Sequence, residues 1–329
     1  MVRIVLLVTS PRLPAGLLTA AAWDLVRAYP VFAGAESEQA VALRAAGVPV
    51  TVLDPDPARL LDAIETEAVV WLAGPAGDQD FARHLGLRLT RTPGLAELEL
   101  MYGSWDPPGA RLLDAVAVMD RLVSPGGDPW KRQQSHQSLA PYLLEESYEA
   151  YDAIEADNSD ELREELGDVL LQIVLHARLA EERPDGTAWS IDDVAGGLVD
   201  KMIRRNPHVF AGERVADIEE ITQNWERIKK AEKSRGSVLD GIALSQPALA
   251  LAAKILQRAE RAGLDVPLPA GPGLGARLLR IVAEARAAGE DAEAALRRAT
   301  LELADAVRAA EPENVAPPSN RPAHHPKPD

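Results

Sequence analysis

The feature that most constrains the fold of this chain is a run of apolar residues at intervals of three and four. It comprises Leu162, Leu166, Val169, Leu170, Ile173, Val174 and Ala177. Because side chains at these intervals share one face of an α-helix, the spacing predicts a helix with one buried side. Asn158 and Glu161, three residues apart, predict a capping box at its start. The same helical period dominates from Arg111 onward, so we expect a mainly α-helical protein.

The first hundred residues follow a different pattern, in which short β-branched runs alternate with helical stretches. The expected strands cover residues 4–8, 48–53 and 68–72. The expected helices cover residues 17–28, 37–46 and 57–65. This alternation predicts a small parallel sheet covered by helices. Proline and glycine concentrate between Ser104 and Gly109, which predicts a domain boundary there.

The whole chain is expected to have four parts, with a mainly α fold preceded by a small α/β domain. Downstream helices are expected at about 190–205, 217–235, 246–262, 274–288 and 291–310. The last 18 residues contain six prolines, which predicts a disordered tail. The parts are an α/β domain at 1–104, a helical domain at 105–266, a helical pair at 267–311 and the tail at 312–329.

Composition excludes several classes of protein. The formal net charge of −16 over 329 residues argues against a protein that coats nucleic acid, because such proteins present a net basic surface. The absence of cysteine excludes disulfides, thiolate nucleophiles and thiolate metal ligands, and it fits a reducing cytoplasm. The longest early apolar run, Ile4 to Val8, is far too short to span a membrane. We therefore expect a cytoplasmic protein without a nucleic-acid or membrane partner.

Acidic residues concentrate strongly in one stretch. Between His136 and Leu170 there are eleven acidic residues and a single basic one. Within this stretch Glu146 and Glu149 share one helix face, as do Glu165 and Asp168. In an antiparallel helical hairpin these four carboxylates converge, and a hard divalent cation such as Mg²⁺, or alternatively Mn²⁺, relieves their repulsion. The other interpretation is a solvated acidic surface that binds no metal.

A basic stretch follows downstream of the acidic one. Between Lys201 and Arg235 there are nine basic residues against six acidic ones. Lys201 and Arg205 lie one helical turn apart, so both can reach the same phosphates. Trp225 and Lys229 repeat that spacing. With the acidic face, this stretch predicts a triphosphate site, whereas ordinary surface charge and a core role for Trp225 are the alternatives. Glycine-rich phosphate loops are absent, so phosphate recognition falls to side chains and metal.

Several motifs, in order along the chain, resemble the MazG family of nucleoside triphosphate pyrophosphohydrolases. They are Asp128-Pro129-Trp130-Lys131, His136-Gln137-Ser138-Leu139, Leu144-Glu145-Glu146-Ser147-Tyr148-Glu149, Glu164-Glu165-Leu166-Gly167-Asp168, Arg204-Arg205-Asn206-Pro207-His208-Val209-Phe210 and Asn224-Trp225-Glu226-Arg227-Ile228-Lys229. The family signature E-E-x-x-E followed by E-x-x-D is intact, and the resemblance covers roughly residues 111–266. The family often has a cysteine where this chain has Asp128, so the resemblance alone carries no binding role over to that loop, including Lys131.

The resemblance implies an all-α MazG-type bundle, formed by a homodimer or higher homo-oligomer, with a defined set of site residues. The implied metal ligands are Glu146, Glu149, Glu165 and Asp168. The implied nucleotide contacts are Tyr142, Glu161, Lys201, Arg204, Arg205, Trp225 and Lys229. Glu145 joins the four metal ligands as a candidate catalytic residue, because Glu145 or Glu149 can orient the attacking water.

The implied activity is Mg²⁺-dependent hydrolysis of nucleoside triphosphates to monophosphate and pyrophosphate, which clears unwanted nucleotides. Two rival functions stay open. One is a non-catalytic module that senses nucleotides, and the other is an enzyme similar to phosphoribosyl-ATP pyrophosphohydrolase. The region before residue 105 lies outside the resemblance. It faintly resembles the opening of a tetrapyrrole methylase domain without the glycine-rich loop, so we expect a degenerate α/β appendage.

Overall fold

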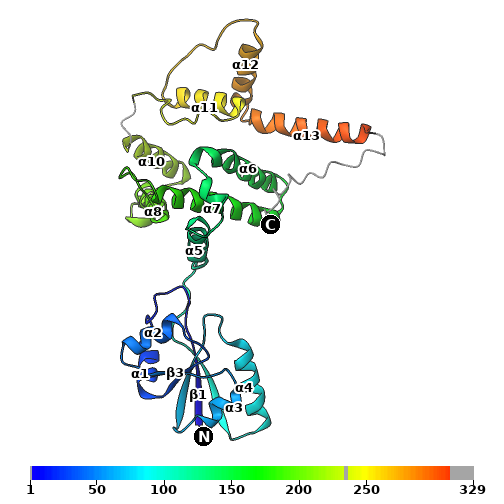
Figure 1. The fold of residues 1–329 in the computed structure, drawn as a ribbon. Helices are drawn as coiled ribbons and strands as arrows, with labels where there is room; N and C mark the ends of the chain where they lie inside the picture. Colours follow the sequence, from blue (N-terminus) through cyan, green and yellow to red (C-terminus); the bar gives the residue numbers. More distant parts are fainter. Residues whose placement is uncertain (1, 233–235, 312–329) are drawn as a thin grey trace. The chain divides into compact units, whose positions relative to one another are not determined.

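The computed structural model describes residues 2–232 and 236–311, which include the elements labelled in Figure 1. The chain separates into two compact units, residues 1–199 and residues 200 onward. The division lies after Val199, whereas the sequence predicted domain boundaries at residues 104 and 266. Those two boundaries stay predictions. The expected tail at 312–329 lies outside the described residues.

The first unit begins with a five-stranded parallel sheet in the order β3-β2-β4-β1-β5. Its strands are β1 (Val2–Val8), β2 (Val31–Ala33), β3 (Val50–Val52), β4 (Ala68–Leu72) and β5 (Ala96–Tyr102). The central strands β1 and β4 are apolar and largely buried, as expected for parallel strands covered on both faces. The three expected strands are confirmed, whereas β2 and β5 are additional strands of the same sheet.

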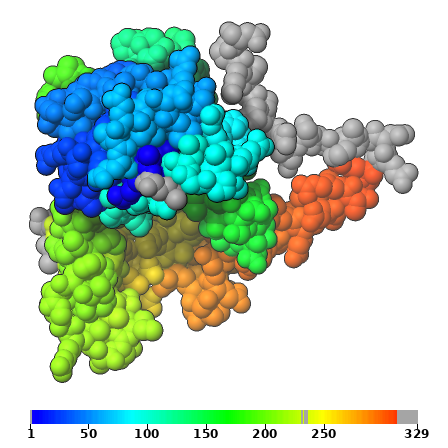
Figure 2. All heavy atoms as spheres, turned by 90° about the horizontal axis from the view of Figure 1, so that it is seen from below, coloured from blue at the N-terminus to red at the C-terminus, as the bar shows by residue number. Residues whose placement is uncertain are grey.

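Helices cover both faces of this sheet (Figure 1). On one face lie α1 (Ala20–Ala28) and α2 (Glu38–Ala45), and their apolar side chains share a core with alternate residues of β1 and β4. On the other face lie α3 (Pro57–Asp62) and α4 (Gln79–Arg91), which pack around Trp71. The result is one closely packed body, blue to cyan in Figure 2. The sequence predicted α1, α2 and α3 but not α4.

The rest of the first unit is helical. It contains α5 (Arg111–Val123), the short 3₁₀ helix η1 (Lys131–Gln133), α6 (His136–Glu155), α7 (Ser159–Glu181) and most of α8 (Ile191–Arg205). The helices α6 and α7 form an antiparallel hairpin whose tight turn places Asp157 in the left-handed region, at φ 52°. Asn158 caps α7 by accepting a hydrogen bond from the Glu161 amide, but the reciprocal bond of the predicted capping box is replaced by one from the Asn158 side chain to the Glu161 carboxylate. Leu139, Val174 and Leu175 pack against α5 and form the core.

One ion-pair network joins the loop after β1 to the start of α5. Arg12 donates two hydrogen bonds to the Asp114 carboxylate, at 2.8 and 2.6 Å, and also pairs with Asp106. Ser10 contributes its hydroxyl to Asp106 and its amide to the Ser104 hydroxyl. The Asp114 pairing lowers the pKa of that carboxyl group, because a nearby guanidinium favours the ionised form. The boundary segment is therefore anchored to the α/β region.

The second unit holds the end of α8 and five further helices. These are α9 (Pro207–Phe210), α10 (Ile218–Ala231), α11 (Ala248–Arg261), α12 (Leu274–Ala287) and α13 (Ala292–Ala310). Among the described residues of this unit, Val282 is the one hydrophobic side chain that is fully buried. Apolar residues such as Leu274, Ile281 and Leu303 are exposed. Across the described chain, no helix is both long enough and apolar enough to cross a bilayer.

Candidate active site

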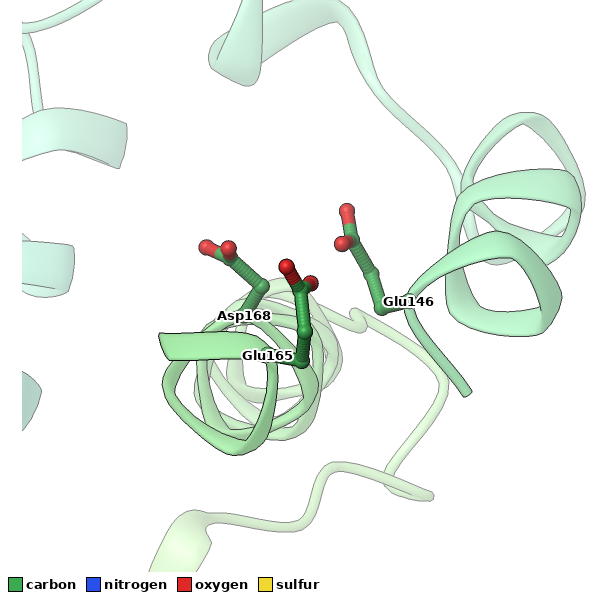
Figure 3. Close-up of side chains that lie close together, drawn as sticks. All are labelled: Glu146, Glu165 and Asp168. Carbon is green, nitrogen blue, oxygen red and sulfur yellow. The ribbon is translucent and has the colours of Figure 1, made fainter. Parts of the chain in front are cut away.

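Three carboxylates converge between α6 and α7. Figure 3 shows Glu146 on α6 facing Glu165 and Asp168 on α7. Each residue offers one carboxylate oxygen, and these three oxygens lie within 4.8 Å of one another. All three residues are half-buried. The antiparallel hairpin thus brings together the side chains that the helical spacing placed on facing sides of two helices.

The charges of this cluster are unbalanced. Burial, and then the charges of Asp168, Glu149, Glu165 and Glu145, raises the pKa of Glu146 to about 7. Burial is also the largest cause that raises the pKa of Glu165, followed by the charges of Glu149 and Asp168. The Glu165 Oε2 atom is buried and has no hydrogen-bond partner among the described residues. Carboxylates that repel one another are a fitting set of ligands for a hard divalent cation.

The remaining predicted residues of the first unit lie around this cluster with different surroundings. Glu149 is half-buried and acts on Glu165, whereas Glu145 is exposed. Tyr142 lies one turn before Glu146 on α6. Glu161 is exposed and accepts a hydrogen bond of 2.8 Å from the Asn158 side chain, so it supports the start of α7.

The predicted basic residues belong to the second unit, where most of them are already paired. Arg204 and Arg205 both contact the Glu232 carboxylate, at 2.7 and 2.6 Å. The Arg205 pairing, followed by that of Arg204, lowers the pKa of Glu232 to about 2. The Arg205 guanidinium carbon also lies 5.3 Å from the centre of the Trp225 ring. Arg204, Arg205, Glu232 and Trp225 therefore form one group, which we call the arginine cluster.

Lys201 and Lys229 complete the predicted basic set. Lys229 lies 3.7 Å from Glu226, a long contact between two partly exposed groups. Lys201 is half-buried and has no ion-pair partner among the described residues. Among the described residues, Lys201 can therefore bind phosphate without breaking an ion pair.

Sequence reasoning missed Glu232 and an aromatic and histidine group at the start of α6. His136 and His176 share a hydrogen bond of 2.8 Å between their Nδ1 atoms, and the His136 ring stacks on Trp189. Burial, and then His136, lowers the pKa of His176. The predicted antiparallel hairpin could have indicated this contact, because it brings the beginning of α6, with His136, beside the end of α7, with His176.

Comparisons with known proteins find similarity over the region that contains this hairpin. Residues 134–210 match the model of the MazG nucleotide pyrophosphohydrolase domain. A protein of Streptomyces cacaoi, described as an uncharacterized 26.1 kDa protein in the blaB 3′ region, is 50% identical over 219 residues, which are 66% of this chain and 89% of that protein. Nucleoside triphosphate pyrophosphohydrolases of Mycolicibacterium smegmatis and Mycobacterium tuberculosis are 48% and 46% identical over 208 and 203 residues. Those matches cover 62% of this chain in both cases.

The matched domain contains the whole α6–α7 hairpin and with it the three converging carboxylates. The chain belongs to the MazG family of nucleoside triphosphate pyrophosphohydrolases. It spans 60% and 59% of the length of the two mycobacterial relatives.

Proposed function

We propose that this protein hydrolyses nucleoside and deoxynucleoside triphosphates to monophosphate and pyrophosphate. The observation that carries the proposal is the convergence of Glu146, Glu165 and Asp168 within the MazG domain. The relatives named as nucleoside triphosphate pyrophosphohydrolases support the same reaction. A sensor that only binds nucleotides would gain nothing from a cluster of carboxylates that repel one another.

Mg²⁺ is the cofactor that we propose, with Mn²⁺ as a substitute. Glu146, Glu165 and Asp168 would hold the ion, and Glu149 would serve as the fourth ligand. The proposal is supported by the neighbouring carboxylates that raise the pKa of Glu146, since a cation would relieve their repulsion, and by the unpartnered Glu165 oxygen. A bound divalent cation supplies Lewis-acid polarisation of the phosphate oxygens.

One carboxylate beside the proposed metal site would then orient the attacking water. Glu149 lies beside Glu165, whereas Glu145 is exposed, so we assign Glu149 rather than Glu145 to orient the attacking water. The oxygen of that water bonds to the α-phosphorus while the bond from this phosphorus to the bridging oxygen breaks. Pyrophosphate then leaves, and the water proton passes to a nearby carboxylate.

Binding of the triphosphate is proposed for Lys201, Arg204, Arg205 and Lys229, with Tyr142, Glu161 and Trp225 as further contacts. Guanidinium groups bind phosphate through charge-assisted hydrogen bonds. Glu232 accepts hydrogen bonds from Arg204 through Nε alone and from Arg205 through Nε and Nη2, so a phosphate group would bind the remaining donors or compete with this carboxylate.

The setting of the reaction is also a proposal. We propose a homodimer, supported by the exposed apolar side chains and sparse core of the second unit. We further propose that the protein acts in the cytoplasm, where it removes unwanted or damaged nucleotides and needs no nucleic-acid partner.

Product analysis tests the proposed function. The protein is incubated with Mg²⁺ and each of the eight common nucleoside and deoxynucleoside triphosphates. We expect equal amounts of monophosphate and pyrophosphate, no diphosphate, loss of activity with EDTA and recovery with excess Mg²⁺. Primary release of orthophosphate would contradict the proposal. Binding without turnover for all eight nucleotides would favour the sensor.

A further inference from the structure

Trp130 is a large aromatic side chain that the structure leaves open to solvent just before α6. It is 45% exposed, although an indole normally gains free energy from burial. The turn that carries it is well ordered by hydrogen bonds. The Asp128 carboxylate accepts the Trp130 amide at 2.8 Å and the Lys131 amide at 3.2 Å. The Gln134 side-chain amide donates to the Trp130 carbonyl at 2.9 Å.

This exposed indole lies next to the carboxylate-bearing face of α6. The rings of Trp130 and Tyr142 meet edge to face, with centroids 5.9 Å apart and planes at 80°. Tyr142 precedes Glu146 by four residues and Glu149 by seven, so all three share one helix face. Four residues of α-helix advance about 6 Å along the axis. The aromatic pair therefore lies about one turn from the carboxylate cluster, on the same side of α6.

A cation accompanies the aromatic pair. The Lys131 ammonium lies 5.6 Å from the centre of the Trp130 ring and 3.1 Å from the Asp128 carboxylate. A positive charge close to an indole and to carboxylates suits a ligand that carries both an aromatic ring and phosphate. A nucleotide carries both an aromatic base and phosphate, and one ribose separates the base from the α-phosphate.

We propose that Trp130, with Tyr142 against it, is the platform on which the base of the bound nucleotide stacks. The inference rests on the proposed function, and it makes Trp130 a specificity-determining residue of the same site. Stacking accepts every base, because each has a π face, but the larger purine surface gains more. The substrate class favoured by this platform is thus the purine nucleoside triphosphates.

The test compares ligands with and without a base, using calorimetric titration of the full chain in Mg²⁺. The probes are the α,β-methylene analogue of ATP, that of UTP, and inorganic triphosphate. For Trp130→Ala we expect about 5- to 100-fold weaker binding of the ATP analogue, a smaller loss for the UTP analogue and less than about two-fold change for triphosphate. Trp130→Phe keeps an aromatic face, so it should retain most of the affinity.

Trp105 provides a matched control in the same unit. It is 63% exposed and lies in the segment before α5. We expect Trp105→Ala to bind all three probes like the wild type. Thermal melting and solution mass of each variant show whether the fold and assembly are kept. A Trp130→Ala protein that loses its assembly would make Trp130 a contact between copies and overturn the platform.

The remaining outcomes separate this inference from the proposed function. Equal affinity of wild type and Trp130→Ala for the ATP analogue, in a protein that hydrolyses nucleotides, would overturn the platform alone. An equal loss for the analogue and for triphosphate would also overturn it, because the base would then contribute nothing. A wild-type protein that neither binds these probes nor hydrolyses nucleotides would overturn the proposed function and the platform together.

Discussion

The carboxylate cluster, formed by Glu146, Glu165 and Asp168, and the arginine cluster differ in how their charges are paired. Glu146, Glu165 and Asp168 face one another with no ion-pair partner among the described residues, and the pKa of Glu146 rises to about 7. In the arginine cluster, Arg204 and Arg205 share Glu232, whose pKa falls to about 2. Carboxylates that repel one another indicate where a cation is needed, whereas two guanidinium groups that share one carboxylate indicate where a phosphate group has to compete with that carboxylate.

The largest expected effect comes from removing one charge of the carboxylate cluster. We expect Glu149→Gln, Glu165→Gln or Asp168→Asn to reduce turnover by at least about 100-fold, because a bound cation contributes several kcal/mol to catalysis. The melting temperature without metal should stay unchanged or rise slightly, since the substitution relieves repulsion. Steady-state kinetics and thermal melting measure both.

Glu155→Gln is the matched control for these variants, because Glu155 is an exposed acidic residue on α6 outside the cluster. It should keep wild-type turnover. Near-wild-type activity in all three cluster variants would remove the carboxylates from the reaction.

A smaller effect is expected in the arginine cluster. Arg205→Ala loses a charge-assisted contact worth about 1.5–3 kcal/mol, which corresponds to about 10- to 150-fold in substrate affinity. Titration with a non-hydrolysable triphosphate measures the loss, and Arg298→Ala on α13 serves as the control. Unchanged affinity of Arg205→Ala would show that this guanidinium keeps Glu232 as its partner and binds no phosphate.

The pairing of Glu232 with Arg204 and Arg205 also predicts a pH dependence of stability. The folded-state pKa of Glu232 lies near 2, below its ordinary value of 4.5, so its ion pair stabilises the protein above pH 4.5. This contribution is lost as the pH falls from 4.5 towards 2. We expect Glu232→Gln to melt below the wild type at pH 7 and to approach it at pH 3. A difference that persists unchanged at pH 3 would contradict the pairing.

The smallest effect on activity is expected at the link between the α/β region and α5. Arg12→Ala removes both hydrogen bonds to Asp114, so the early part of the chain should become more sensitive to proteolysis near residues 104–110. Turnover should stay within about two-fold of wild type, because Arg12 lies outside the residues assigned to the site. A large loss of turnover with intact folding would show that the α/β region supports the active site.

The sequence predicted the helices more completely than the sheet, for physical reasons. Helix α7 has 23 residues, so the apolar face identified between Leu162 and Ala177 repeats over several turns. Strand β2 has only three residues, too few to show a period. Strand β5 alternates Glu97 and Glu99 with Leu98 and Leu100, but it is an edge strand with mostly exposed side chains. Its alternation was a usable signal that was overlooked.

The sequence predicted those features of the site that follow from helical spacing, but not those that depend on tertiary packing. The spacing of Glu146, Glu149, Glu165 and Asp168 predicted two facing carboxylate pairs, and three of these groups converge. The spacing did not show that Glu146 would have the strongly raised pKa, because burial within the hairpin is the main cause. Nor did it show Glu232 beside Arg205 or Trp130 beside Tyr142, since these contacts depend on tertiary packing.

The most direct test of the central claim is hydrolysis in ¹⁸O-labelled water with Mg²⁺ present. Attack on the α-phosphorus places the label in the monophosphate, whereas attack on the β-phosphorus places it in pyrophosphate. We predict label in the monophosphate alone, at one atom per turnover, and no labelled product from Asp168→Asn. Label in pyrophosphate or in orthophosphate as the primary product would contradict the account.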